Sequence, residues 1–141
     1  MKFLRRWLVR PPALQGLPAG RAGEDWICYL YERQGYTLVA RNYALYGQKK
    51  LGEIDLIFQD QKRLIMVEVK TRESETFMEL LETVDWRKQA FLRRMAKFFL
   101  QAHPEYETFG LQIDVAGVLL DTVDNSVKSV RIIENAIEDL E

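Results

Sequence analysis

The chain has 141 residues, of which 48% are hydrophobic, so it can bury one compact core but is too short for two ordinary domains. Its net charge of -1 excludes a protein that coats nucleic acid by bulk electrostatics, because such binding needs a large excess of Lys and Arg. The single cysteine, Cys28, excludes an internal disulfide and a cysteine-based zinc site, which suits a reducing compartment. We expect Cys28 to be a core residue.

Residues 1–20 are predicted to form a flexible basic arm, because prolines and glycines interrupt them and no acid occurs before Glu24. Residues 21–141 are predicted to form a single domain. Arg5 and Arg6 break the first apolar stretch before it is long enough for an export signal, and no stretch is long enough to span a membrane. We therefore expect a cytoplasmic protein without a membrane partner.

The domain opens with a predicted helix over residues 21–34, in which Ile27, Leu30 and Tyr31 form the inner side and Asp25 the solvent side. Gly35 ends this helix. Three runs rich in aromatic and β-branched residues follow, and turn-prone residues separate them. We predict that these runs, 36–45, 51–58 and 63–70, pair as an antiparallel meander.

A second helix is predicted over residues 84–102, since an apolar stripe recurs at helical spacing and Pro104 cannot continue the helix. The stripe consists of Val84, Phe91, Leu92, Met95, Phe98 and Phe99. Two further strands are predicted at 111–120 and 126–133, with a turn at Asp124 and Asn125. The order α-β-β-β-α-β-β predicts an α/β fold, a central mixed sheet flanked by helices.

Charged residues interrupt two of the apolar strands. Asp55 lies in one, and Glu68 and Lys70 lie in the next. Side chains alternate along a strand, so Glu68 and Lys70 should project from one face while Val69 projects from the other. If Asp55 points to the face of Glu68, two carboxylates and an ammonium group converge, as a divalent cation and an activated water require. The simpler alternative is a Glu68–Lys70 ion pair, with Asp55 accepting backbone hydrogen bonds.

Three further charged residues are candidates for the site or its support. Glu24 projects on the inner side of the first helix, although an acid in a first turn also interacts favourably with the helix dipole. Lys88 lies in the apolar stripe of the second helix and can reach a phosphate, but a stem that carries its charge out to water is the favoured interpretation. Asp114 either pairs with Arg41 or another cation, or supports the site from behind.

These residues occur in motifs that resemble the bacterial YraN-like proteins, an uncharacterised branch of the PD-(D/E)XK nuclease superfamily. The resemblance covers roughly residues 21–118. The motifs are Gly23-Glu24, Gly35-Tyr36, Arg41-Asn42, Gly52-Glu53-Ile54-Asp55-Leu56-Ile57, Val67-Glu68-Val69-Lys70-Thr71-Arg72, Lys88 and Asp114-Val115. The superfamily includes restriction enzymes and Holliday-junction resolvases.

The resemblance implies a restriction-endonuclease-like fold and a Mg²⁺- or Mn²⁺-dependent nuclease that cuts DNA, with branched or recombination intermediates as one substrate class. It implies that Asp55, Glu68 and the Val69 carbonyl bind the metal. It further implies that Lys70 orients or activates the water and that Glu24 is an additional acid. The basic residues expected to contact nucleic acid are Lys88, Arg72 and Arg41. Because many nucleases that cut both strands act as dimers, a homodimer fits the same expectation.

Two other functions remain open at this stage. The weak net charge of the chain is also consistent with a catalytically inactive module that keeps the fold and binds nucleic acid or a protein partner. A plain structural domain, in which the inward charges merely pair with each other, is the third interpretation.

Overall fold

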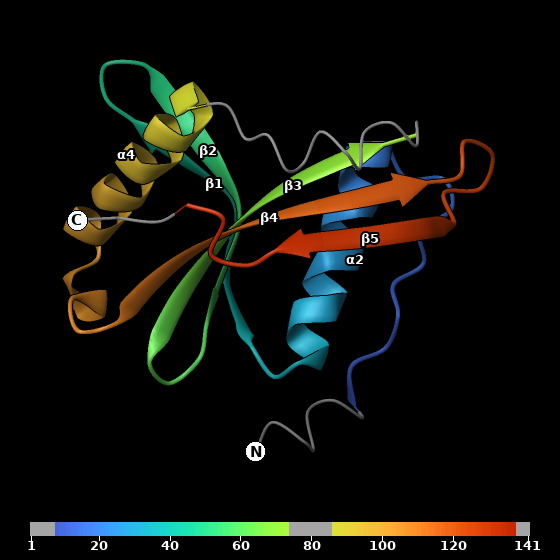
Figure 1. Ribbon diagram of the computed structural model, residues 1–141, viewed down its shortest axis with the longest axis horizontal. Helices are drawn as coiled ribbons and strands as arrows, with labels where there is room; N and C mark the ends of the chain where they lie inside the picture. Colours follow the sequence, from blue (N-terminus) through green and yellow to red (C-terminus); the bar gives the residue numbers. More distant parts are fainter. Residues whose placement is uncertain (1–7, 74–85, 138–141) are drawn as a thin grey trace.

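The computed structural model describes residues 8–73 and 86–137. Its five strands form one mixed sheet in the order β1-β2-β3-β4-β5 (Figure 1). The elements are α2 (Ala19–Arg33), β1 (Thr37–Tyr46), β2 (Lys50–Gln59), β3 (Arg63–Arg72), α4 (Trp86–Ala102), a short 3-10 helix (Pro104–Tyr106), β4 (Gly110–Leu120) and β5 (Val127–Ile133). The predicted α/β class and element order are confirmed.

The pairing of the strands follows from the lengths of their connections. β1, β2 and β3 are joined by short turns and pair antiparallel, which confirms the predicted meander. β3 and β4 pair in parallel from Arg63–Gly110 to Arg72–Leu119, and a parallel pair needs a long crossover, which here contains α4. β5 returns antiparallel to β4 after a turn at Asn125, whose φ of 60° is the left-handed conformation that asparagine tolerates.

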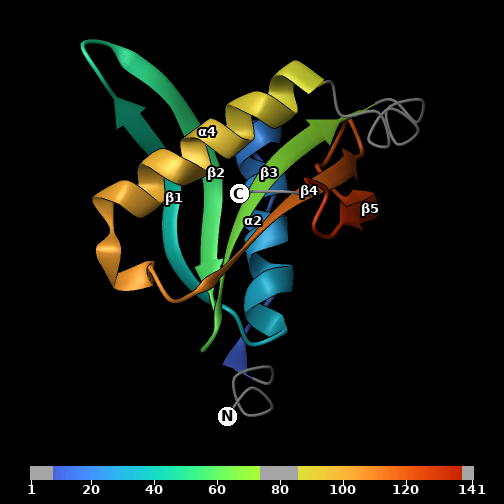
Figure 2. The same cartoon turned by 60° about the vertical axis from the view of Figure 1, so that its left-hand side comes forward.

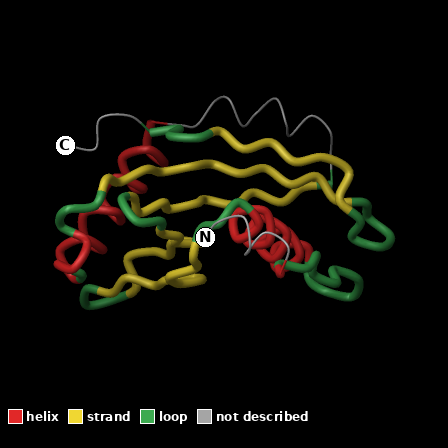
Figure 3. The backbone as a smooth tube through the Cα atoms, turned by 90° about the horizontal axis from the view of Figure 1, so that it is seen from below, coloured by secondary structure: helices red, strands yellow, loops and turns green. Residues whose placement is uncertain are grey.

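The two long helices cover opposite faces of the sheet. In Figure 2, α4 crosses in front of β1 and β2 while α2 lies behind β3 and β4, and in Figure 3 the helices lie apart along the sheet. α2 packs Ile27 and Tyr31 on Phe58 and Val67. The core on the α4 face contains Leu92, Met95 and Phe99 together with Ile57, Leu64, Met66 and Ile113.

Two of the predicted helix faces need correction. Phe98 was expected in the apolar stripe of α4, but 37% of it is exposed, and the fully buried Ala96 joins the inner face instead. Asp25 was expected on the solvent side of α2, but only 16% of its side chain is exposed because Arg41 of β1 covers it. A helical projection shows only the residues of the helix itself, so it does not reveal that a side chain of a neighbouring strand covers one of them. Val84 lies outside the described residues.

The helix α2 begins at Ala19, two positions before the predicted start, and the residues preceding it lie against the last turn of the sheet. Leu14 is buried in the α2-side core. The side-chain amide of Asn125 donates hydrogen bonds to the carbonyls of Leu14 and Leu17, at 3.0 and 2.8 Å. No helix among the described residues is long and apolar enough to cross a membrane.

Candidate functional site

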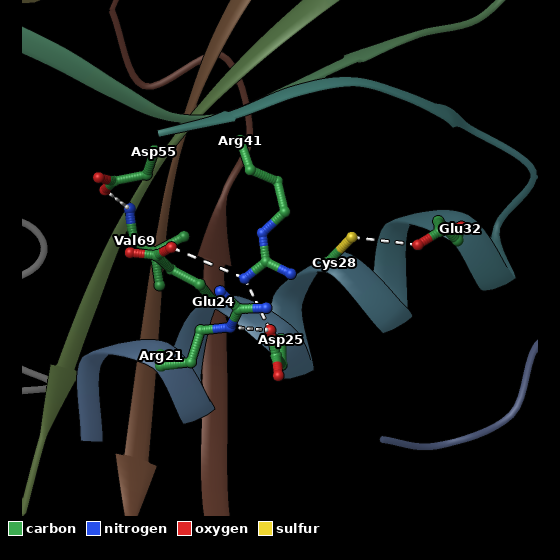
Figure 4. Close-up of polar contacts among 8 residues, drawn as sticks. All are labelled: Arg21, Glu24, Asp25, Cys28, Glu32, Arg41, Asp55 and Val69. Atoms are coloured by element: carbon green, nitrogen blue, oxygen red, sulfur yellow. Dashed lines mark hydrogen bonds and ion pairs between the residues drawn. The ribbon is translucent and has the colours of Figure 1, made fainter. Parts of the chain in front are cut away.

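The candidate site lies where β2 parts from β3. The β2–β3 pairing runs from Gln59–Leu64 to Leu56–Val67, whereas β2 itself continues outward beside β1. Just past the last pair, Oδ2 of Asp55 accepts a hydrogen bond from the backbone N–H of Val69, at 2.8 Å (Figure 4). The carboxylate of Asp55 is thereby held against β3 at the point where the two strands separate.

Asp55 is held in surroundings that oppose its negative charge. Burial is the largest cause that raises its pKa, to about 7, and the charge of Glu68 is the second. The Val69 N–H and the ammonium group of Lys88 act in the opposite direction, and Glu24 adds a further raising effect. The three predicted acids Asp55, Glu68 and Glu24 therefore belong to one electrostatic neighbourhood.

Glu68 faces α4. Its neighbours Val67 and Val69 pack in the core beneath α2, so alternation places Glu68 and Lys70 on the other side of the sheet. Oε1 of Glu68 lies 2.9 Å from Nζ of Lys88, and only 13% of the Glu68 side chain is exposed. Lys88 is therefore paired with a carboxylate, although 36% of its side chain is exposed, so the favoured interpretation of a charge carried only into water needs correction.

Lys70 is half-buried and forms no ion pair within the described parts of the chain. The simple alternative, a Glu68–Lys70 ion pair, is therefore not formed, because Glu68 pairs with Lys88 instead. An ammonium group on the same face as Glu68 is left available for another negative group. The family resemblance implies that this lysine orients or activates water, and that role stays a prediction.

Glu24 reaches this region from the first turns of α2. The helix can approach β3 closely because residue 23 is glycine: a Cβ there would lie 1.8 Å from Oγ1 of Thr71. The pKa of Glu24 is raised, chiefly by burial, while a hydrogen bond with Asn42 and the charge of Arg41 lower it. Asn42 is a contact that sequence reasoning missed, and its φ of 48° is the left-handed conformation that asparagine tolerates.

Arg41 is held by acids of α2, as Figure 4 shows. Its guanidinium lies 2.6 Å from Oδ1 of Asp25 and 3.8 Å from Oε1 of Glu24, and Arg21 lies 3.0 Å from the same oxygen of Asp25. One alternative for Asp114, a pairing with Arg41, is not formed, because Arg41 contacts Asp25 and Glu24 instead. The guanidinium group of Arg41 therefore offsets the negative charges of Asp25 and Glu24 at the edge of the site nearest to α2.

Asp114 is a structural carboxylate on the α2 side of the sheet. It is 1% exposed and accepts hydrogen bonds from the Tyr31 hydroxyl at 2.5 Å, the Gln112 amide at 2.8 Å and the Asn135 backbone N–H at 2.9 Å. These donors satisfy a buried carboxylate without a cation. Tyr31 was predicted as a core residue, but its hydroxyl as the partner of Asp114 was missed.

Arg72 ends β3 in an exposed position, where its guanidinium donates to the Thr71 carbonyl at 2.7 Å. Burial is the main cause that raises the pKa of the Cys28 thiol, to about 12, and the thiol donates a hydrogen bond to Glu32, so the predicted core role of Cys28 is confirmed.

In the described part of the chain, no three His, Cys, Asp or Glu side chains gather closely enough to hold a metal by themselves.

Comparison with known proteins places the chain in a family. The model of the uncharacterised protein family UPF0102 matches residues 23–118, which hold all the candidate residues above. The chain belongs to UPF0102. The predicted resemblance to the YraN-like family is thereby confirmed.

Curated UPF0102 relatives align over most of both chains. The UPF0102 protein of Caldicellulosiruptor bescii is 31% identical over 117 residues, 83% of this chain and 94% of the relative. That of Desulforamulus reducens is 32% identical over 126 residues, 89% of this chain and 99% of the relative. A UPF0102 protein of Clostridium botulinum is 32% identical over 119 residues, 84% of this chain and 93% of the relative.

Proposed function

We propose that this UPF0102 protein is a Mg²⁺- or Mn²⁺-dependent nuclease that hydrolyses DNA phosphodiester bonds, with branched or recombination intermediates among its substrates. The observation that carries the proposal is the position of Asp55. Its carboxylate accepts a hydrogen bond from β3 and lies near Glu68, and burial and the charge of Glu68 raise its pKa. An uncharged residue at this position would avoid that cost. Acids whose pKa is shifted by burial and by a neighbouring charge are typical of functional sites.

The donor set suits a hard divalent cation. Asp55 and Glu68 supply carboxylate oxygens, and the Val69 carbonyl supplies a neutral oxygen, which are ligands that Mg²⁺ accepts. Among the described residues, Oδ1 of Asp55 and Oε2 of Glu68 have no hydrogen-bond or ion-pair partner. When bound, the cation would polarise the phosphate and lower the pKa of a water molecule.

The other side chains of the site would serve the same reaction. Lys70, on the Glu68 face, orients the attacking water and offsets negative charge as the phosphate is attacked. Lys88 holds Glu68 in position and adds positive charge near the scissile group. Glu24, tied to Arg41 and Asn42, is a further acid that accepts hydrogen bonds from water at the rim.

Cleavage assays test this proposal directly. Purified protein is incubated with Mg²⁺ or Mn²⁺ and with linear duplex, single-stranded and four-way-junction DNA. We expect cleavage of at least one DNA, and a loss of at least about a hundredfold in Asp55→Asn and Lys70→Met. Asp124→Asn, the same chemical change in an exposed turn, should cleave normally. If no DNA is cut with either metal, the enzymatic proposal is abandoned.

A second candidate is a non-catalytic module, which the Lys88–Glu68 ion pair favours, because the ammonium group occupies an oxygen that a metal would use. Calorimetric titration with Mn²⁺ separates the two functions. A nuclease should bind Mn²⁺, and Glu68→Gln should weaken that binding. A protein that takes up no Mn²⁺ yet still binds DNA would favour the module.

A further inference from the structure

The helix α4 carries an unusual distribution of charge. Its 17 residues include five basic residues and no acid: Arg87, Lys88, Arg93, Arg94 and Lys97. Because the whole chain has a net charge of -1, the remainder of the chain is acidic. Solvent-facing helices usually gain stability from Glu–Lys pairs one turn apart, whereas like charges such as Arg93 and Lys97 cost about 0.2–0.5 kcal/mol. Ion pairs within α4 therefore do not explain this composition.

Three of the basic residues lie on one exposed stripe. Arg87, Arg94 and Lys97 are separated by seven and three residues, so they recur on the same side of the helix, opposite the buried Leu92 and Met95. From Arg87 to Lys97 the helix rises about 15 Å. Phosphates of one DNA strand advance about 3.4 Å each along the duplex axis, so the stripe can follow several of them.

The β1–β2 hairpin lies beside α4. Figures 1 and 2 both show α4 running alongside this hairpin. The contact is close because residue 52 is glycine: a Cβ there would lie 2.3 Å from Cζ of Phe91 and 3.3 Å from Sδ of Met95. The hairpin tip next to it presents Lys49 and Tyr46, both exposed. We call the stripe and the tip, Tyr46, Lys49, Arg87, Arg94 and Lys97, the basic ridge.

The basic ridge begins beside the candidate site. Lys88, the neighbour of Arg87 at the start of α4, is the residue whose Nζ lies 2.9 Å from Glu68. We propose that the basic ridge binds the sugar-phosphate backbone of duplex DNA and leads it past Glu68. This inference rests on the proposed function and names the surface that brings its substrate to the site. The carboxylates of the candidate site repel an anionic polymer such as DNA. The positive charge of the basic ridge attracts such a polymer and holds it next to the site.

The test measures binding apart from cleavage. A fluorescein-labelled duplex is titrated with the full chain in EDTA by fluorescence anisotropy, over a series of salt concentrations. We expect Arg94→Gln/Lys97→Gln to weaken binding at least about tenfold and to reduce the slope of log K against log salt by about 0.9 for each phosphate that the variant no longer neutralises. The matched control is Arg33→Gln/Lys62→Gln, which removes two exposed charges outside the basic ridge and should change neither.

Each outcome decides the matter. Equal losses in the two double variants, or unchanged binding in Arg94→Gln/Lys97→Gln, would overturn the inference even if the wild-type protein cleaves DNA. Selective loss in Arg94→Gln/Lys97→Gln supports it even if no cleavage is found, so the failure of the proposed function is seen separately. Tighter binding to polyglutamate or to duplex RNA than to duplex DNA would also overturn it. Circular dichroism of both double variants verifies that they are folded.

Discussion

At Asp55 the folded chain holds an acid where ionisation is unfavourable. A carboxyl whose pKa is raised on folding takes up a proton more readily in the folded than in the unfolded state. The penalty is therefore absent in acid, where both states are protonated, and grows as the pH rises from about 4 towards 7. Above that range the folded protein bears the full cost of the Asp55 charge.

Replacing Asp55 by asparagine should remove this cost. The amide oxygen still accepts the Val69 N–H, while the charge facing Glu68 is gone. In EDTA at pH 8 we expect Asp55→Asn to raise the Tm by about 2–6 °C, with the gain shrinking as the pH falls towards 4. Thermal unfolding followed by circular dichroism measures it. A gain that is independent of pH would contradict the prediction, and Asp124→Asn should show no gain at pH 8.

Individual contacts of the site were the least predictable from sequence. Local alternation of side chains was enough to place Glu68 and Lys70 on one face of β3. It was not enough to assign partners, because Lys88 and Arg41 reach their carboxylates from other elements, and the choice depends on how helices cross the sheet. A long side chain can satisfy several neighbours, and sequence spacing does not rank them.

At the scale of elements, the approach of α2 to β3 depends on one glycine. Gly20 and Gly23 lie in the same helix, but a Cβ at Gly20 meets nothing within 4 Å while one at Gly23 meets Thr71. We expect Gly20→Ala to stabilise the protein by about 0.4–1 kcal/mol and Gly23→Ala to destabilise it by about 1–3 kcal/mol. Urea unfolding measures both.

The same pair of variants tests how the site is assembled. Gly23→Ala should push the start of α2, and Glu24 with it, away from β3, so DNA cleavage should fall more than the loss of folded protein accounts for. Gly20→Ala should cleave normally. Equal stabilities of the two variants would show that Thr71 moves aside and that the close approach is not needed.

Element order and type could be predicted because each depends on local pattern. Apolar periodicity marked α2, α4 and the strands β1 to β5, and Gly35 and Pro104 marked the helix ends. Phe98 is partly exposed, and Arg41 covers Asp25. Both features depend on which element packs against the helix, so helical periodicity alone could not predict them.

At the scale of the whole molecule, Asn125 joins residues far apart in the chain. Its amide holds the carbonyls of Leu14 and Leu17. Asn125→Gly keeps the left-handed backbone but removes that amide, so the segment before α2 should open more often. We expect faster amide exchange at Leu17, measured by hydrogen–deuterium exchange.

Asn135→Gly is the matched control for this change. Asn135 also has positive φ, but its contact with Asp114 uses the backbone N–H, which glycine retains. Exchange at Leu17 should be unchanged in this variant. Similar exchange in Asn125→Gly and the wild-type protein would mean that burial of Leu14 alone holds the segment.

The parallel pairing of β3 with β4 bears on the order in which the chain folds. Asp55 and Glu68 come from strands joined by a short turn, so we expect the two acids to meet early in folding, and Lys88, which lies on the long crossover, to arrive later. During that interval the nascent hairpin carries two carboxylates without their counter-charge. We therefore expect the repulsion between Asp55 and Glu68, which also raises the pKa of Asp55, to oppose formation of the hairpin until Lys88 arrives.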